Sequence, residues 1–156
     1  MSHLKDLNRE TQILEIGCGA GQFANMLFDY GFSNYTGFDY AAEGVLLAKG
    51  NNPKHTDCFF VADAFQTELL NQDYDLIICF EVLEHIQKDL ELLNRIRPGT
   101  KMLLSVPNFN DPYHVRYFEN EQEVQARYSQ VMRIFKISVA MLSQTNCLYY
   151  IWGEKL

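Results

Sequence analysis

The sequence predicts an α/β protein in which a doubly wound, mostly parallel sheet carries helices on both faces. Strand and helix signals alternate along the chain and are joined by short connections, which is the pattern of such sheets. One strand, at residues 74–80, is continuously apolar after Asp75, as a strand buried on both faces should be. A glycine turn at residues 17–21 joins the first strand to the first helix.

Glycine and proline set the bounds of the expected elements. Gly31 follows the first helix, the run Gly-Asn-Asn-Pro at residues 50–53 follows the second, Pro98 ends the third, and Pro107 ends the fifth strand. We expect strands at 12–16, 35–38, 58–62, 74–80 and 101–106, helices at 22–30, 41–49, 82–96 and 119–132, and a closing antiparallel hairpin from 134–141 and 148–152. No repeat or linker divides the sequence, so we expect one domain over residues 1–156.

The composition narrows the class of protein. A chain of 156 residues, 47% of them hydrophobic, is long enough for one domain with a substantial core. The formal net charge of -7 disfavours a nucleic-acid partner, although scattered basic residues could still gather into a patch. The four cysteines lack metal-binding spacing, and neither a signal peptide nor a membrane span is apparent. We therefore expect a soluble, cytoplasmic protein with no membrane partner.

The glycine turn is the first candidate for a ligand site. Glycines let a ligand approach the backbone, and the helix that follows offers unpaired N–H groups to a carboxylate. The turn has the spacing Gly-x-Gly-x-Gly, whereas dinucleotide sites use Gly-x-Gly-x-x-Gly to admit a pyrophosphate. Glu15 precedes the turn, and no Lys or Arg occurs between residues 12 and 48. These features favour a cationic ligand, with a tight turn that binds nothing as the alternative.

Two further acids follow successive predicted strands. Asp39 ends the second strand, where it could accept hydrogen bonds from ribose hydroxyls. Asp63 ends the third strand and precedes Ala64 and Phe65, so its carboxylate could meet an adenine amino group while Phe65 makes apolar contact. A single Asp is more often a loop or cap residue. Acids at successive carboxyl ends of parallel strands, however, face one crevice.

At this point the sequence resembles the class I S-adenosylmethionine-dependent methyltransferases, over residues 12–107. The matching segments are 14–21 (Leu-Glu-Ile-Gly-Cys-Gly-Ala-Gly), 37–39 (Gly-Phe-Asp), 61–64 (Val-Ala-Asp-Ala), 74–77 (Tyr-Asp-Leu-Ile), 81–85 (Glu-Val-Leu-Glu-His) and 97–100 (Arg-Pro-Gly-Thr). The resemblance implies S-adenosylmethionine as cofactor. It also implies a Rossmann-like seven-stranded sheet of order 3-2-1-4-5-7-6 with strand 7 antiparallel.

The resemblance also assigns roles to residues. The turn would hold the methionine moiety, Asp39 the ribose and Asp63 the adenine amine, and Phe80 and Glu81 would lie beside the sulfonium. The predicted cofactor-binding residues are Glu15, Gly17, Cys18, Gly19, Gly21, Phe38, Asp39, Tyr40, Asp63, Ala64, Phe65, Phe80 and Glu81.

His85 and Glu81 are the predicted catalytic residues. Methyl transfer needs a base only where the acceptor must lose a proton, and imidazole titrates near neutral pH. A packing or capping role for His85 is the alternative. On a helix, Glu81, Glu84 and His85 would share one face. Similar Glu-x-x-Glu-His runs bind a divalent metal in ubiquinone-biosynthesis O-methyltransferases and small-RNA 2′-O-methyltransferases, whereas many relatives need none. We assign no metal and leave this point open.

The segment that follows the fifth strand, residues 105–118, is the predicted acceptor wall, because it is rich in Pro, Asn and aromatic residues. Its expected polar contacts are Asn108, Tyr113, His114 and Arg116. Pairing of Arg116 with Glu119 or Glu121 is the structural alternative, and we favour it slightly.

Few residues precede the first strand, whereas many relatives carry N-terminal helices that cover the acceptor. We therefore expect a short or absent lid, and this favours a large acceptor or self-association as a homodimer. The leading hypothesis is a methyltransferase that acts on an oxygen or nitrogen atom of a small molecule. An RNA or other macromolecular methyltransferase, with or without a metal, is the first alternative. A catalytically inactive cofactor-binding module is the second. An NAD-dependent oxidoreductase fits neither the glycine spacing nor the lack of nearby cations.

Overall fold

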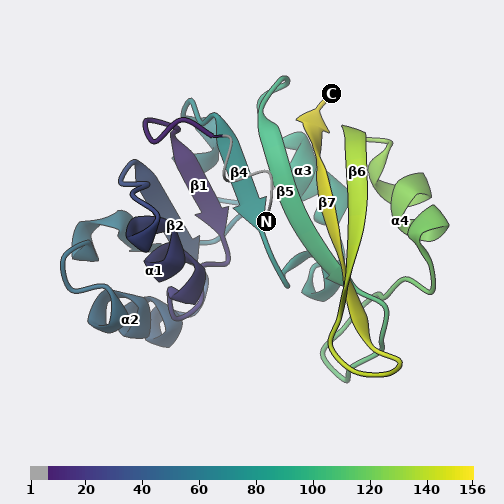
Figure 1. Cartoon of the computed structure of the whole chain (residues 1–156). Helices are drawn as coiled ribbons and strands as arrows, with labels where there is room; N and C mark the ends of the chain where they lie inside the picture. Colours follow the sequence, from purple (N-terminus) through teal and green to yellow (C-terminus); the bar gives the residue numbers. More distant parts are fainter. Residues whose placement is uncertain (1–6) are drawn as a thin grey trace.

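A computed structural model describes residues 7–156, so the polar segment 1–6 lies outside the described residues. It contains one seven-stranded sheet of order β3-β2-β1-β4-β5-β7-β6 (Figure 1). The strands are β1 (Ile13–Ile16), β2 (Tyr35–Asp39), β3 (Phe59–Val61), β4 (Leu76–Cys79), β5 (Lys101–Pro107), β6 (Met132–Met141) and β7 (Cys147–Lys155). All pairings are parallel except those of β7 with β5 and β6. The predicted strand order and the antiparallel strand are thus confirmed.

The helices cover both faces of this sheet. They are α1 (Gln22–Asp29), α2 (Ala42–Asn51), α3 (Asp89–Asn94) and α4 (Glu121–Tyr128), with short 3-10 turns η2 (Thr56–Cys58), η3 (Leu69–Asn71) and η4 (Leu83–His85). Apolar residues of α1 and α2 pack in one core cluster, and those of α3 and α4 pack in the other. Successive residues of β1 alternate between the clusters, Ile13 in the first and Leu14 in the second, as the pleat requires.

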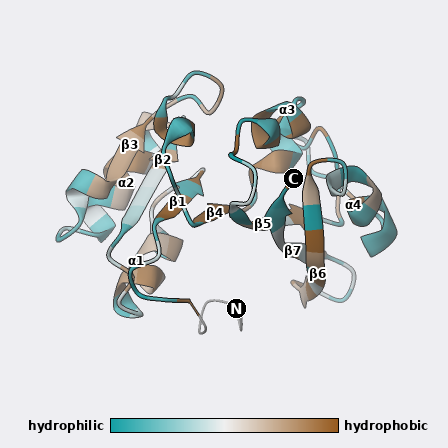
Figure 2. Cartoon of the chain, turned by 90° about the horizontal axis from the view of Figure 1, so that it is seen from above, coloured by the Kyte–Doolittle hydropathy of each residue, from teal (hydrophilic) through white to brown (hydrophobic). Residues whose placement is uncertain are grey.

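The hydropathy of the elements matches these positions. All four residues of β4 are buried, which confirms the prediction from its continuous apolar run. By contrast, α4 lies on the surface and is hydrophilic over most of its length (Figure 2). Only Val124 and Tyr128 of this helix are buried. Among residues 7–156, no helix has the length and apolar character that crossing a bilayer would require.

The predicted helix at residues 82–96 is wrong. The chain instead forms the single turn η4 and then the short helix α3. The carbonyl oxygens of Leu83, Ile86 and Gln87 accept hydrogen bonds from the guanidinium group of Arg116, which lies in the loop after β5. In a continuous helix these carbonyl groups would pair with N–H groups four residues further on. The long-range contacts of Arg116 replace those helical hydrogen bonds.

Candidate functional site

A cavity of about 280 Å³ opens at the carboxyl ends of the parallel strands. Its walls come from the ends of β1 and β2, from the segment after β3 and from the segment after β4. The lining residues are Ile16, Gly17, Phe38, Asp39, Tyr40, Ala62, Ala64, Glu81, Val82, His85 and Ile86. Seven of these residues were predicted as site residues. The other four, Ile16, Ala62, Val82 and Ile86, are apolar, and only their proximity to strand ends could have indicated them.

The glycine turn forms the floor of this region at the end of β1. Gly17 and Gly21 both have a φ of 75°, a left-handed conformation that favours glycine. A Cβ atom on Gly17 would lie 2.2 Å from the side chain of Val82, which itself lines the cavity. Asp39 braces the turn, because its Oδ2 accepts a hydrogen bond of 2.9 Å from the amide of Gly19. The turn therefore requires glycine both for its backbone conformation and for space.

Glu15 lies in β1, two residues before the turn, and is not one of the residues that line the cavity. It is 3% exposed, and its Oε2 accepts a hydrogen bond of 2.5 Å from the hydroxyl of Tyr35 in β2. The ring of Tyr35 passes over Gly37, where a Cβ atom would lie 2.3 Å from the tyrosine oxygen. Burial raises the pKa of Glu15 to about 8, although the bond from Tyr35 opposes the rise. No pattern in the sequence indicated this buried pair.

Other groups face the Glu15 carboxyl. Asp39 raises the pKa of Glu15 further through its negative charge. Burial, together with the charges of Glu15 and Asp39, raises the pKa of the Cys18 thiol to about 12. Burial is also the main reason that the pKa of the Cys79 thiol in β4 is raised, with Glu84 and Glu15 adding to it. Both thiols are thus held in the neutral form.

The predicted adenine-side residues divide into two groups. Ala64 lines the cavity. The carboxylate of Asp63 accepts hydrogen bonds of 2.8 Å from the amide of Phe65 and from the side chain of Gln66. Phe65 is 36% exposed. Asp63 and Phe65 therefore lie at the rim of the site and do not line the cavity.

Phe80 and Glu81 follow β4 and point in different directions. Phe80 packs between the rings of Phe23 and Tyr150, with centroid distances of 4.9 and 5.4 Å, outside the cavity. Glu81 lines the cavity and has a φ of 54°, a strained conformation for a residue other than glycine. Ser105 of β5 holds it in place: the Ser105 hydroxyl accepts from the Glu81 amide at 2.9 Å and donates to Glu81 Oε1 at 2.6 Å.

Two histidines from separate loops meet beside the cavity. The rings of His85 and His114 have centroids 5.0 Å apart. His85 Nδ1 lies 3.0 Å from the carbonyl oxygen of Tyr113, and His114 Nδ1 lies 3.2 Å from that of Phe109. Because a carbonyl oxygen only accepts, both Nδ1 atoms must carry the proton and donate it. The Nε2 atom of each neutral ring is then left with a free lone pair.

Glu84 completes this cluster. Its side chain is fully buried, and among residues 7–156 neither of its carboxylate oxygens has a hydrogen-bond partner. Burial raises the pKa of Glu84 to about 7, and the charge of Glu81 adds to the rise. One ligand atom each from Glu84, His85 and His114 lie within 4.8 Å of one another. Glu81 is not a member of this group, because residue 81 precedes the η4 turn rather than sharing a helix face with Glu84 and His85.

The predicted acceptor residues also divide. His114 lies against His85, and Tyr113, which is 81% exposed, supplies the carbonyl oxygen for His85. Asn108 instead joins the end of β5 to the start of β7. Its side chain donates a hydrogen bond to the Thr145 carbonyl at 2.9 Å and accepts one from the Cys147 amide at 2.6 Å. Arg116 has a structural partner, but it is Asp89 at 3.3 Å rather than the expected Glu119 or Glu121.

The strand order, with β7 antiparallel, and the glycine turn at the end of β1 define a Rossmann-like methyltransferase fold. Comparison with known proteins agrees. A family model described as a methyltransferase domain matches residues 2–144. The chain therefore belongs to the methyltransferase domain family, within the class I methyltransferases that use S-adenosylmethionine. The resemblance and the cofactor predicted from the sequence are thus confirmed.

Individual relatives show how far the likeness extends. A ubiquinone biosynthesis O-methyltransferase of Rickettsia felis is 31% identical over 115 residues, which is 69% of this chain and 45% of that relative. The chain thus spans less than half the length of this relative. A SAM-dependent methyltransferase of Methanosarcina mazei has a TM-score of 0.75 at 18% identity, covering 99% of this chain and 97% of that one. The [4+2]-cyclase SpnF has a TM-score of 0.78 at 12% identity, covering 96% and 76%. These structural matches establish the fold alone.

The buried carboxyl group of Glu15 predicts a pH-dependent stability. Its pKa is raised from 4.5 to about 8, so the folded protein holds a proton that the unfolded chain releases between these values. The stability contributed by this proton is complete below pH 4.5 and is lost as the pH rises through 8. We expect Glu15→Gln, which stays neutral, to lose less stability than the parent protein between pH 5 and pH 8. Thermal unfolding at several pH values measures this difference, because a change of about 1 kcal/mol in the free energy of unfolding shifts Tm by about 2–4 °C.

The matched control for this experiment is Glu43→Gln, since Glu43 is exposed on α2. It should keep the parent protein's dependence of Tm on pH. An equal dependence in Glu15→Gln and in the parent protein would show that Glu15 is not the group that titrates.

Proposed function

We propose that this chain transfers the methyl group of S-adenosylmethionine to an oxygen or nitrogen atom of a small-molecule acceptor, with oxygen favoured because the curated relatives are named O-methyltransferases. The observation that carries the proposal is the composition of one cavity: Gly17 and Asp39 line one side of it, and Glu81 and His85 line the other. The first pair belongs to the motif that the family uses for its cofactor, and the second pair adds a carboxylate and a base.

The cofactor would lie across the ends of β1, β2 and β3. The turn at Gly17 and Gly21, which has no Cβ atoms at these positions, lets the methionine moiety approach the backbone. Asp39 already accepts hydrogen bonds from the amides of Gly19 and Ala41, but a carboxylate has further lone pairs with which to accept from ribose hydroxyls. Ala64 and the rim residues Asp63 and Phe65 would surround the adenine. The negative charge of Glu81 favours a sulfonium at this end of the cavity.

In the transfer step, a lone pair of the acceptor atom attacks the methyl carbon in line with the bond to sulfur. That bond breaks, its electron pair stays on sulfur, and S-adenosylhomocysteine leaves. His85 Nε2 takes the proton of a hydroxyl acceptor, because Nδ1 is occupied by the Tyr113 carbonyl. The protein's main contribution is alignment of the two reactants and exclusion of water.

A metal-assisted form of this reaction is the second candidate, and the observation that favours it is the cluster of Glu84, His85 and His114. A carboxylate and two imidazoles suit divalent transition metals, and a buried carboxylate without partners is costly unless a cation pairs with it. The hydrogen bonds from Nδ1 to carbonyl oxygens are also those that metal-binding histidines make. A bound cation would polarise an acceptor hydroxyl.

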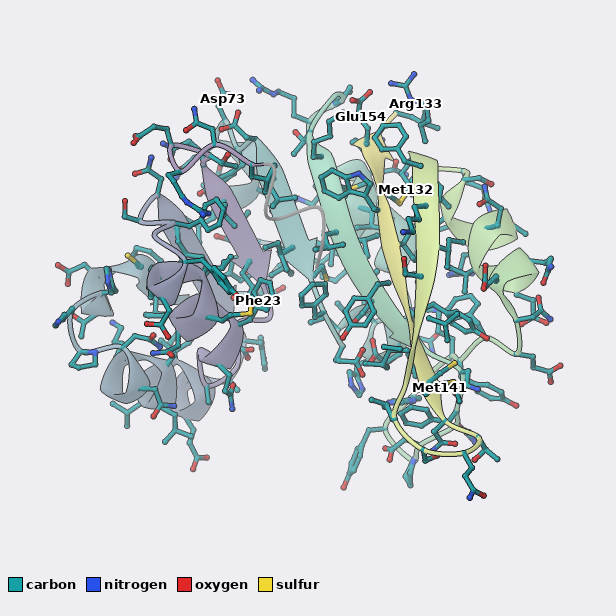
Figure 3. The ribbon with its side chains drawn as sticks, in the orientation of Figure 1. Phe23, Asp73, Met132, Arg133, Met141 and Glu154 are labelled. Carbon is teal, nitrogen blue, oxygen red and sulfur yellow. The ribbon has the colours of Figure 1, made fainter. Side chains whose placement is uncertain are left out.

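Cofactor binding tests the first part of the proposal. We expect isothermal titration to detect binding of S-adenosylmethionine and S-adenosylhomocysteine, and we expect Asp39→Asn to weaken it by about 10-fold or more through loss of charge-assisted hydrogen bonds. Asp73→Asn is the control, because Asp73 lies at the opposite end of the sheet, where it pairs with Arg97 on the surface (Figure 3). No heat of binding from folded parent protein, or equal losses in the two variants, would contradict the proposal.

Turnover tests the role of His85. With a panel of phenolic and amine acceptors, we expect release of S-adenosylhomocysteine, and we expect His85→Gln to lower kcat by about 10²–10⁴-fold while leaving cofactor affinity unchanged. His55→Gln is the control, since His55 stacks on Phe28 away from the cavity. Cofactor binding without turnover of any acceptor would favour the inactive binding module. Unchanged kcat in His85→Gln would remove the base from the mechanism.

Metal content separates the two candidates. If the cluster binds a cation, protein dialysed against Mn²⁺ or Zn²⁺ retains about one ion per chain by elemental analysis. His114→Gln should lower the affinity for the metal ion by about 10–100-fold, whereas Asp39→Asn should leave this affinity unchanged. Equal retention by the parent protein and His114→Gln, or full activity after chelation, would rule out the metal-assisted form.

A further inference from the structure

Arg116 lies behind the wall of the cavity and contacts none of the space inside it. Its guanidinium group donates to the carbonyl oxygens of Leu83, Ile86 and Gln87, the last at 2.9 Å. Its side chain is 12% exposed. These three carbonyl groups belong to the segment that carries His85 and part of the cavity wall. One side chain from the loop after β5 thus fixes the backbone of the loop after β4.

The same two loops are joined at two more points. The amide of Val115 donates to the Glu84 carbonyl at 2.8 Å, and His85 Nδ1 donates to the Tyr113 carbonyl at 3.0 Å. Residues 113, 115 and 116 lie close together in the chain, and all three form hydrogen bonds with the segment 83–87. These hydrogen bonds between the two loops set the direction of the His85 ring and the tautomer that it holds.

Arg116 is in turn anchored by a buried carboxylate. Asp89, whose side chain is 1% exposed, lies 3.3 Å from Arg116 and forms a two-pronged ion pair with Arg127 of α4 at 2.6 and 2.8 Å. The hydroxyl of Tyr128 donates to it at 3.1 Å. Arg127 shares the carboxylate with Arg116, and its hydrogen bonds go to Asp89 rather than to the backbone of residues 83–87. Both arginines pair with Asp89, but it is Arg116 that also binds the backbone that carries His85.

We propose that Arg116 is a positioning residue for methyl transfer: by joining the loops after β4 and β5 it holds His85 in the Nδ1-protonated tautomer with Nε2 toward the cavity. This inference rests on the proposed function for its consequence in catalysis, but its structural core is independent of the acceptor. The role differs from both expectations from the sequence, the acceptor contact and the slightly favoured pairing with Glu119 or Glu121, because Arg116 acts through the loop and not on the substrate.

Nitrogen-15 NMR of selectively labelled histidine tests the structural core. The chain has four histidines, so each ring can be assigned by single substitution. We expect His85 to hold the Nδ1–H tautomer in the parent protein and in Arg127→Ala, and to lose it in Arg116→Ala, while His55 stays unchanged in all three. Arg127→Ala is the matched control, because each variant removes one cation from Asp89. Retention of the tautomer in Arg116→Ala, or equal loss in Arg127→Ala, would overturn the proposal.

Turnover gives the second readout. We expect Arg116→Ala to lower kcat by about 10²-fold, the cost of a small misplacement of a reacting group, with the Kd for S-adenosylmethionine within about twofold of the parent value. Arg116→Lys, which keeps the cation and part of the hydrogen bonding, guards against a failure of the alanine variant to fold and should recover part of both kcat and the tautomer. A fall in cofactor affinity that matches the fall in kcat would overturn the positioning role. Failure of the parent protein to bind S-adenosylmethionine would instead contradict the proposed function and leave the tautomer result standing.

Discussion

The parallel pairing of β1 with both β2 and β4 is the constraint on which the rest of the structure depends. Glu15 lies opposite Gly37 in β2 on one side and Ile78 in β4 on the other. The connections from the carboxyl ends of these strands leave in different directions, so a space remains between them at this edge of the sheet. The cavity occupies that space. The place of the candidate site is therefore a result of topology, and side chains decide only what the site holds.

Burial of the strand ends imposes a second demand. Backbone N–H groups at the cavity rim no longer have neighbours in the sheet, and one left unpaired in a buried position costs about 1–3 kcal/mol. Asp39 satisfies the amide of Gly19, and Ser105 satisfies that of Glu81. Asp39 thus stabilises the glycine turn, and Ser105 stabilises the strained backbone at Glu81. Asp39 and Glu81 both line the cavity, so residues that take part in these contacts also belong to the site.

The sequence predicted what is encoded locally. The buried strand β4 and the glycine turn follow from apolar runs, breakers and the conformational needs of glycine, whereas the strand order was expected from the resemblance to class I methyltransferases. Gly17, Asp39 and His85 share a cavity because Gly17 follows β1, Asp39 ends β2 and His85 lies in the segment after β4, at the same edge of the sheet. Strand alternation also explains one difference: Ile16 lines the cavity, so Glu15 must face the opposite side of β1, where it meets Tyr35.

What the sequence could not predict depends on contacts between distant residues. Ser105 and Glu81 are 24 positions apart, and Arg116 reaches carbonyl groups 29 to 33 positions away. The apolar spacing in residues 82–96 is compatible with a helix, and no local signal records that a guanidinium group will take its carbonyl oxygens. The position of a long, flexible side chain is fixed only when the whole fold has assembled its partners.

The charged residues around the cavity can be related to the positive charge that moves in the proposed reaction. On the proposed function, the positive charge begins on the sulfonium and ends, with a hydroxyl acceptor, on the imidazolium of His85. Glu81 shares the cavity with His85, and Glu84 belongs to the cluster around His85, so carboxyl groups lie close to the base. Neither Arg116 nor Arg127 lines the cavity, and both pair with the buried carboxylate of Asp89. A shared fold with a protein named a [4+2]-cyclase shows that the sheet alone does not select this chemistry. The loops after β4 and β5, joined by Arg116, are the part of this chain that could.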